Sequence, residues 1–524
     1  MRLIHNAPWW LISAGIHAVF LLGAALIYVE RLMAIDEICF DVRPREALPL
    51  PVLPEPEKTR DTFTRKGLPS DEKEETRSTN DEPVIFNPIA KKSDHNESNN
   101  NEDDHRMRGD STDFLSWTPG EAGGARGRQL GRTPGVNDQI GVGKGAGGGG
   151  RYGFRTGGRE DLVKTETGRI TDNAVVAALR WLARHQNAEG GWSASAFCTK
   201  CSGRGDSDFD AGVTSLSLLA FLGAGYTQLS RDEMIDPVEP GVILRPAEVV
   251  RKSLQWLTSH QDPEGCVGER GQKYMYNHAI AALALSEAYG MTVAPILKEP
   301  AQKAIDFLVA SQNPNKGWRY SSKCNDNDTS VTGWAVMALK SAEISGLNFP
   351  ASAYQGALNW LNEATETNNY YMTGYNARGT GKVFVPGKNE QFDHHPSMSA
   401  VAVMSRIFIQ KKREPALTAV NLLAGDLPAW KPGQVDFYYW YYASLALFQY
   451  DGPKGPFWSK WNEPMKNAIV PNQKTASCGC ENGSWDPAAD RWGFEGGRVY
   501  AAAINCLTLE VYYRYAHVFG GSAK

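Results

Sequence analysis

Residues 178–192, ALRWLARHQNAEGGW, decide the fold because two later stretches of the chain repeat them without a gap. These stretches are SLQWLTSHQDPEGCV at 253–267 and AIDFLVASQNPNKGW at 304–318. Each has the pattern of a helix with an aromatic residue beside a leucine, followed by a glutamine and a glycine turn. Self-similarity of this length is typical of architectures built from repeated helical units.

A second segment, rich in small and apolar residues, follows each of these turns, at 211–225, 278–290 and 329–342. Three weaker copies of the pair follow, at 357–364 and 395–409, at 419–430 and 436–450, and at 465–485 and 498–515. Helices that are apolar on nearly every face are buried, so the second segments are predicted to form an inner ring inside the amphipathic first segments. We therefore predict an all-α fold over residues 166–524, a six-pair α/α toroid (an α6/α6 barrel), with an open superhelix as the alternative.

The repeat resembles a motif of a known superfamily. Trp181-Leu182, Gln186, Gly190 and Trp192 match the aromatic-Leu, Gln and Gly-x-Trp pattern of the QW repeat in squalene and terpenoid cyclases. A similar repeat occurs in protein prenyltransferase β subunits. The resemblance covers about 350 residues and implies the α/α-toroid fold; it does not by itself imply a chemistry.

The resemblance implies a proton-donating acid at the start of an inner helix, in an Asp-x-Asp-Asp-Thr motif. This chain has Asn325-Asp326-Asn327-Asp328-Thr329 instead, with asparagine at the donor position. Asp326 and Asp328 are the candidate catalytic acids, and a buried acid with a raised pKa would be needed. Asp328 is equally suited to cap the helix, since aspartate accepts hydrogen bonds from free backbone N–H groups there. Aspartates that point into a cavity would favour an enzyme, and aspartates folded onto helix N–H groups would favour a scaffold.

In a closed ring, all six inner helices begin at the same end, and polar residues near their starts are predicted to form a rim. These residues are Asp210, His278, His394, His395, Asp436 and Arg498, above a lining of Trp334, Tyr438 and Trp440. Aromatic walls with a few polar groups are typical of ligand pockets, although the aromatic residues are also suited to fill a core.

Four cysteines are predicted to meet where the first and sixth pairs become neighbours, namely Cys198, Cys201, Cys478 and Cys480. Such a group could hold a structural Zn²⁺ or form disulfides, and free thiols are the third alternative. A prenyltransferase-type zinc site is not expected, because the sequence contains no Asp-x-Cys and Cys506 has no evident partner ligand.

The N-terminal part differs from the rest of the chain. Residues 9–29 carry no formal charge and are long enough to cross a bilayer, so residues 1–34 are predicted to be a single-pass membrane anchor. Residues 35–165 are rich in proline, charge and then glycine, and are predicted to be a disordered linker. A short N-terminus usually stays inside, so the toroid is expected at the cell membrane on the extracytoplasmic side.

Composition and motifs together leave two functions open. A net charge of −4 and the absence of a basic tract argue against nucleic-acid binding. One function is a terpenoid cyclase-like enzyme or binding protein whose cavity takes a hydrophobic, isoprenoid-like ligand. The other is a non-catalytic scaffold or binding module for a glycan, peptide or protein partner at the cell surface.

Overall fold

The computed structural model describes residues 152, 155, 159, 162–239, 241–367, 372–379, 384–391, 396–413 and 416–515. All of them belong to the second of two compact units of the chain, Glu82–Lys524. The predicted anchor and most of the predicted linker lie outside the described residues, so both stay predictions. Within the described ranges, no helix has both the length and the apolar character that a membrane span requires.

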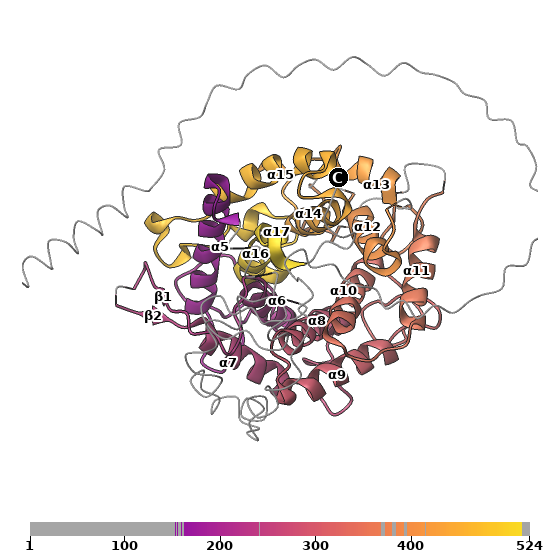
Figure 1. Cartoon of the computed structure of the whole chain (residues 1–524), viewed down its shortest axis with the longest axis horizontal. Helices are drawn as coiled ribbons and strands as arrows, with labels where there is room; N and C mark the ends of the chain where they lie inside the picture. The colour runs from indigo at the N-terminus through magenta and orange to yellow at the C-terminus, as the bar shows by residue number, and fades with distance from the viewer. Residues whose placement is uncertain are drawn as a thin grey trace, which may run out of the picture. The chain divides into compact units, whose positions relative to one another are not determined.

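Helices alternate between outer and inner positions around a ring (Figure 1). The outer helices are α5 (Glu166–Arg184), α7 (Pro246–Ser259), α9 (Pro295–Ala310), α11 (Ser352–Ala364), α13 (Leu417–Leu423) and α15 (Pro456–Ile469). The inner helices are α6 (Asp210–Gly223), α8 (Tyr274–Thr292), α10 (Thr329–Ser345), α12 (Ser397–Gln410), α14 (Phe437–Asp451) and α16 (Gly493–Leu509). The short α17 (Val511–Arg514) follows α16, and a small antiparallel ribbon, β1 (Met234–Ile235) and β2 (Ile243–Leu244), precedes α7 with Met234 opposite Leu244.

Burial follows the composition of the two kinds of helix. In α7, the buried residues include Val250, Leu254 and Leu257, spaced at four and three residues along one face. In α10, by contrast, fifteen of seventeen residues are buried, from Thr329 to Ile344. The inner helices therefore form the core, and the outer helices cover it.

The ring is closed. Contacts join α6 to α8, α8 to α10, α10 to α12, α12 to α14, α14 to α16, and α16 back to α6. The predicted closed arrangement is therefore present, and the open superhelix is not.

The repeated glutamine explains how successive units are joined. The Gln186 side-chain amide donates to the carbonyl oxygen of Gly190 in its own turn at 2.8 Å and to that of Val249 in the next outer helix at 2.9 Å. Gln261, Gln312 and Gln473 make the same pair of bonds, to Gly265 and Pro300, to Lys316 and Ala353, and to Gly483 and Ala174. The last of these pairs joins the sixth unit to α5 and closes the ring with the same contact that joins the others.

One part of the linker prediction is wrong at its C-terminal end. Tyr152 and Arg155, predicted to lie in the disordered linker, are fully buried. The Arg155 guanidinium donates to the backbone carbonyl of Leu222, at the end of α6, and pairs with Glu287 at 2.8 Å. The pairing is favourable because a buried carboxylate needs a counter-ion, and Glu287 has Arg514 beside it as well. These residues fill the end of the barrel at which the inner helices finish.

Candidate functional site

A cavity of about 360 Å³ lies at the opposite end of the barrel, where the inner helices begin. All six inner helices contribute to its wall near their N-termini, through Gly212, Tyr276, Ser330, Ser397, Tyr438 and Gly496. Its size is within the range of small-molecule pockets. The convergence of helix starts predicted from the closed ring therefore produces a cavity.

The deeper wall of the cavity is largely apolar and aromatic. Val213, Leu216 and Ile280 line it from α6 and α8, with Trp334 from α10 and Met398 from α12. The indole of Trp334 stacks on Tyr441 at a centroid distance of 5.7 Å and meets Tyr438 edge-on at 6.5 Å. These contacts pack the aromatic side chains of the wall against one another.

Tyrosines surround the polar part of the cavity and share hydrogen bonds. Ser330 Oγ bonds with the Tyr438 hydroxyl at 2.6 Å and also with the Tyr276 hydroxyl. The hydroxyls of Tyr320 and Tyr375 bond with each other at 2.5 Å. Burial, together with the charge of neighbouring groups, raises the pKa of Tyr276 well above its usual value, so these hydroxyls are neutral donors and acceptors.

Three basic side chains lie on the cavity wall. Lys273 pairs with Glu495 at 2.7 Å, and Arg319 pairs with Asp326. Burial alone would lower the pKa of Lys273, but the hydrogen bond and charge of Glu495 raise it, so the ammonium is retained. Arg491 is the third basic residue, with its guanidinium 5.6 Å from the ring centre of Trp492.

Asp328, the first candidate acid, caps α10. Its Oδ1 accepts the Val331 N–H at 2.7 Å, and the side chain is fully buried behind the cavity wall and is not part of the lining. Its Oδ2 has no hydrogen-bond partner among the described residues. Burial raises the pKa of Asp328 to about 7, against the opposing effect of the Val331 N–H. The second candidate, Asp326, is 59 % exposed and paired with Arg319 at the surface.

The other two predicted aspartates differ from each other. Asp210 is the first residue of α6 and accepts the N–H of Ala194 rather than capping its own helix. Asp436 does cap α14, accepting the Tyr439 N–H at 2.8 Å, and it also lines the cavity. Its neighbour Asp490, which was not predicted from the sequence, accepts the Phe437 N–H at 2.7 Å. Burial and the charge of Asp436 raise the pKa of Asp490 well above its usual value.

The structure places several predicted rim and lining residues elsewhere. His278 is fully buried between the Val267 N–H and the Ala304 carbonyl, so it is a core residue. Trp440 packs against Trp430 and Phe437 outside the cavity, because its position along α14 turns it toward the outer layer. His394 and His395 lie outside the described residues.

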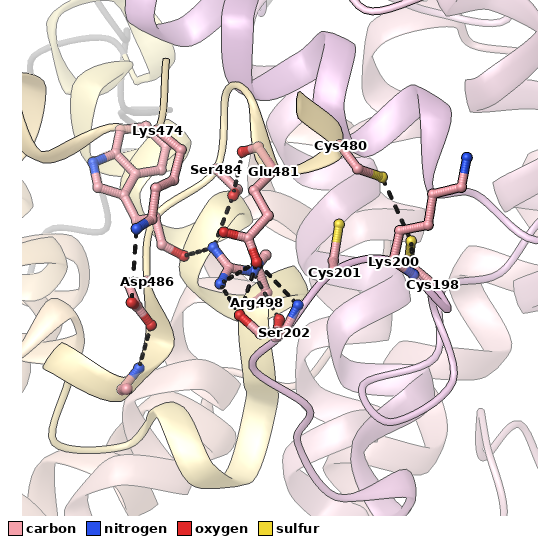
Figure 2. Close-up of polar contacts among 12 residues, drawn as sticks. Cys198, Lys200, Cys201, Ser202, Lys474, Cys480, Glu481, Ser484, Asp486 and Arg498 are labelled. Carbon is pink, nitrogen blue, oxygen red and sulfur yellow. Dashed lines mark hydrogen bonds and ion pairs between the residues drawn. The ribbon is translucent and has the colours of Figure 1, made fainter. Parts of the chain in front are cut away.

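Arg498 lies at the junction of the first and sixth repeats instead of on the cavity rim (Figure 2). Its guanidinium pairs with Glu481 at 3.0 Å and donates to the Ser202 carbonyl at 2.8 Å. The backbone is kinked at Gly497 (φ of +64°), directly before Arg498. Because of this kink, Arg498 belongs to α16 but is not part of the cavity lining. Of the predicted lining residues, Trp334 and Tyr438 do lie on the cavity wall.

The same junction holds a cluster of possible metal ligands. Cys198, Cys201 and Cys480 lie together with His185, all ligand atoms being within 4.8 Å of one another. Cys478 is exposed and does not belong to the cluster, because Cys480, two residues later, is the cysteine that faces the other ligands. His185 was not expected there, although its position directly before the repeated Gln186 places it at the turn that carries the cysteines.

Residues 243–403 match the family model of the squalene-hopene cyclase C-terminal domain. This match, together with the closed ring of helices, confirms the resemblance to the terpenoid cyclase-like α/α-toroid superfamily. No curated protein matches the chain.

The solved structures to which the chain is similar have low sequence identity and TM-scores below 0.5. A type II terpene cyclase from Scytonema is 14 % identical, with 67 % of this chain and 99 % of that one covered at a TM-score of 0.41. An inactive variant of an α-1,6-mannanase of Salegentibacter, in complex with α-1,6-mannotriose, is 11 % identical, with 66 % and 98 % covered at a TM-score of 0.42. An endo-β-1,4-glucanase from Acetobacter xylinum is 10 % identical, with 66 % and 99 % covered at a TM-score of 0.37.

Proposed function

We propose that the toroid binds a small amphipathic ligand of the isoprenoid class in the cavity at the start of its inner helices. The observation that supports this proposal most directly is the division of the cavity into an apolar, aromatic wall and a polar wall. A ligand with a hydrocarbon body and one polar end matches both parts. The match to a family model named after squalene and hopene supports the isoprenoid class.

The apolar wall suits a branched hydrocarbon chain. Leu216, Ile280 and Met398 line the cavity together with Trp334 and present aliphatic surface to a ligand. Burying hydrocarbon surface contributes about 25 cal/mol per Å², and methionine adapts readily to an irregular ligand.

The polar wall suits a hydroxyl or anionic end group. Tyr500 and Asn277 belong to the cavity lining, and the Tyr500 hydroxyl and the Asn277 Oδ1 are buried behind its surface with no hydrogen-bond partner among the described residues. A buried polar atom without a partner is costly, so a ligand that pairs with it is favoured. Lys273 and Arg319 lie on the same wall and would attract an anion.

We also propose that the predicted anchor holds this binding domain at the cell membrane, where isoprenoid lipids are found. The support for this part is the uncharged stretch at 9–29 alone.

The test is a titration of the full-length protein with farnesol and with farnesyl diphosphate, followed by tryptophan fluorescence and mass spectrometry. Ile280→Trp fills the cavity from α8, and Ile243→Trp is the matched control, because Ile243 is 48 % exposed and not part of the lining. The filled cavity is expected to weaken binding by about tenfold or more, while the control binds as the wild type does. Equal affinity in the two variants, or no binding of either compound by the wild type, would contradict the proposal.

A second candidate function is acid catalysis on the bound ligand, and Asp328 is the observation that favours it. A buried carboxyl with an unpartnered oxygen and a pKa of about 7 is half protonated at neutral pH and can donate a proton. It would have to act across the wall formed by Ser330, Tyr276 and Tyr438, whose hydroxyls are hydrogen-bonded to one another. New products from squalene or farnesol that vanish in Asp328→Asn would establish catalysis, whereas unchanged substrate bound to both proteins would leave a binding protein.

A further inference from the structure

Three cysteines and a histidine at the junction of the first and sixth repeats have the composition of a closed metal site. Cys198 and Cys201 come from the loop after α5, His185 is the residue that ends α5, and Cys480 comes from the 3-10 segment Ala476–Glu481 of the sixth repeat. The cysteine side chains lie together at this junction (Figure 2). An odd number of thiols with a histidine among them cannot be explained by paired disulfides alone.

Distances between the ligand atoms fit tetrahedral zinc. The sulfurs of Cys198 and Cys480 are 3.6 Å apart, and His185 Nε2 is 3.3 Å from the sulfurs of both Cys201 and Cys480. A Zn–S distance near 2.3 Å and a Zn–N distance near 2.0 Å place neighbouring ligands about 3.5 to 3.8 Å apart in a tetrahedron. All four ligand atoms lie within 4.8 Å of one another, so movements of about 1 Å would bring them to one ion.

Groups around the cluster are arranged as metal sites require. His185 Nδ1 bonds with the Trp181 carbonyl at 2.7 Å, so Nδ1 carries the proton and Nε2 is left to bind a metal. The Lys200 N–H donates to the sulfur of Cys198 at 3.3 Å, which stabilises a thiolate. The two-residue spacing of Cys198 and Cys201 is that of structural zinc sites.

The second repeat provides an internal comparison. His260 occupies the position of His185 and makes the same bond to a carbonyl, that of Trp256, at 2.8 Å. His260 is exposed, and among the residues that the structure describes, only the cluster at the junction brings three or more such ligand atoms together. The histidine therefore recurs in the second repeat without a ligand cluster around it, and the grouping of three cysteines with the histidine is particular to the junction.

We propose that His185, Cys198, Cys201 and Cys480 bind one Zn²⁺ that fastens the first repeat to the sixth. Four protein ligands leave no open position, so this ion is structural rather than catalytic. The peptide chain joins every other pair of neighbouring repeats, whereas this junction depends on non-covalent contacts, among them the backbone bonds from the Asp206 N–H to the Glu495 carbonyl and from the Arg498 N–H to the Gly203 carbonyl. The ion adds a bond that stabilises the closed ring.

The test is elemental analysis of the full-length protein, purified under reducing conditions with Zn²⁺ present and then dialysed. About one Zn²⁺ per chain is expected for the wild type and for Cys478→Ser, the matched control two residues from Cys480. Cys480→Ser and His185→Ala are expected to retain little or no zinc, and His185→Cys to restore it. Cobalt in place of zinc is expected to give the strong visible absorption of tetrahedral thiolate coordination in the wild type.

Thermal unfolding distinguishes the loss of the metal site from a general folding defect. Removal of zinc with a chelator is expected to lower the Tm of the wild type and of Cys478→Ser by several degrees, but not that of Cys480→Ser. The proposal is overturned if the folded wild type takes up no zinc, if Cys480→Ser retains it, or if mass spectrometry finds Cys198, Cys201 or Cys480 in a disulfide in the purified protein.

Discussion

Replacing Asp328 with asparagine tests whether this buried carboxyl is neutral in the folded protein. Burial raises its pKa from 3.8 to about 7. In the unfolded chain the group ionises near 3.8, so the folded state holds a proton that the unfolded state loses over the range between the two values. The stabilisation that results is complete below pH 3.8 and is lost as the pH rises through about 7.

The magnitude follows from these two pKa values. Each unit of pKa corresponds to about 1.4 kcal/mol, so the free energy of unfolding falls by about 2 to 3 kcal/mol between pH 5 and pH 8 through this group alone. Asparagine keeps the Oδ1 acceptor for the Val331 N–H but has no proton to lose in this range. Asp328→Asn is therefore expected to gain stability relative to the wild type by that amount as the pH rises.

The assay is guanidinium unfolding of the full-length wild type and variant at several pH values from 5 to 8, followed by tryptophan fluorescence. Asp326→Asn is the matched control, because its side chain is 59 % exposed and pairs with Arg319. The reasoning would be refuted if the difference in free energy of unfolding between wild type and Asp328→Asn were the same at every pH from 5 to 8. That result would also remove the argument for Asp328 as an acid.

Three further substitutions test the packing of the ring. Gln473→Leu removes the amide bonds to Ala174 and to its own turn, both 2.8 Å, and is expected to cost about 1 to 3 kcal/mol, measured by denaturant unfolding. Gly190→Ala is expected to cost about 1 to 3 kcal/mol, since Gly190 has φ of +100° and an added Cβ would lie 2.3 Å from the Lys252 carbonyl oxygen. Glu287→Gln leaves two buried guanidinium groups without their anion and is expected to cost about 3 to 5 kcal/mol, or to prevent folding.

Each of these substitutions has a control within the chain. Gln261→Leu removes the same kind of bond between two repeats that are consecutive in the sequence. Amide hydrogen exchange should therefore increase around α7 and α9 in Gln261→Leu, and around α5 and α15 in Gln473→Leu. An added Cβ at Gly346 meets open space, so Gly346→Ala should cost less than Gly190→Ala. Glu343 forms half-buried ion pairs, and Glu343→Gln should cost less than Glu287→Gln. If a control variant lowers the free energy of unfolding as much as the substitution it is paired with, the packing argument for that position is wrong.

The repeat made the ring predictable because its contacts are local and recur. Gln186 and Gly190 lie four residues apart, and the glutamine contact recurs at Gln261, Gln312 and Gln473, so one interpretation applies to four of the six units. The composition of the inner segments then decides which helices are buried. Both signals are properties of short stretches, which is why the order of elements and the closed ring could be predicted from the sequence.

The cavity wall was harder to predict because much of it comes from loops. Lys273, Arg319 and Arg491 precede inner helices or follow turns, and no periodic pattern specifies where such residues point. Rotation about the helix axis was a second source of error, since Trp440 and Tyr438 lie two residues apart on α14 but face different surroundings. His185, a ligand of the proposed zinc site, was missed for a related reason, since the direction of its side chain is set by the end of α5.

Ring closure links the cavity to the proposed metal site. The wall includes Val213 on α6 and Tyr500 on α16, and these two helices contact each other only because the first and sixth repeats meet. If this junction opened, the inner helices would separate at that point and the cavity would lose one side. The hydrogen bond from the Arg498 guanidinium to the Ser202 carbonyl and the cluster around Cys480 join these two repeats, although neither lines the cavity. Side chains remote from the cavity therefore help to determine whether the two sides of its wall stay together.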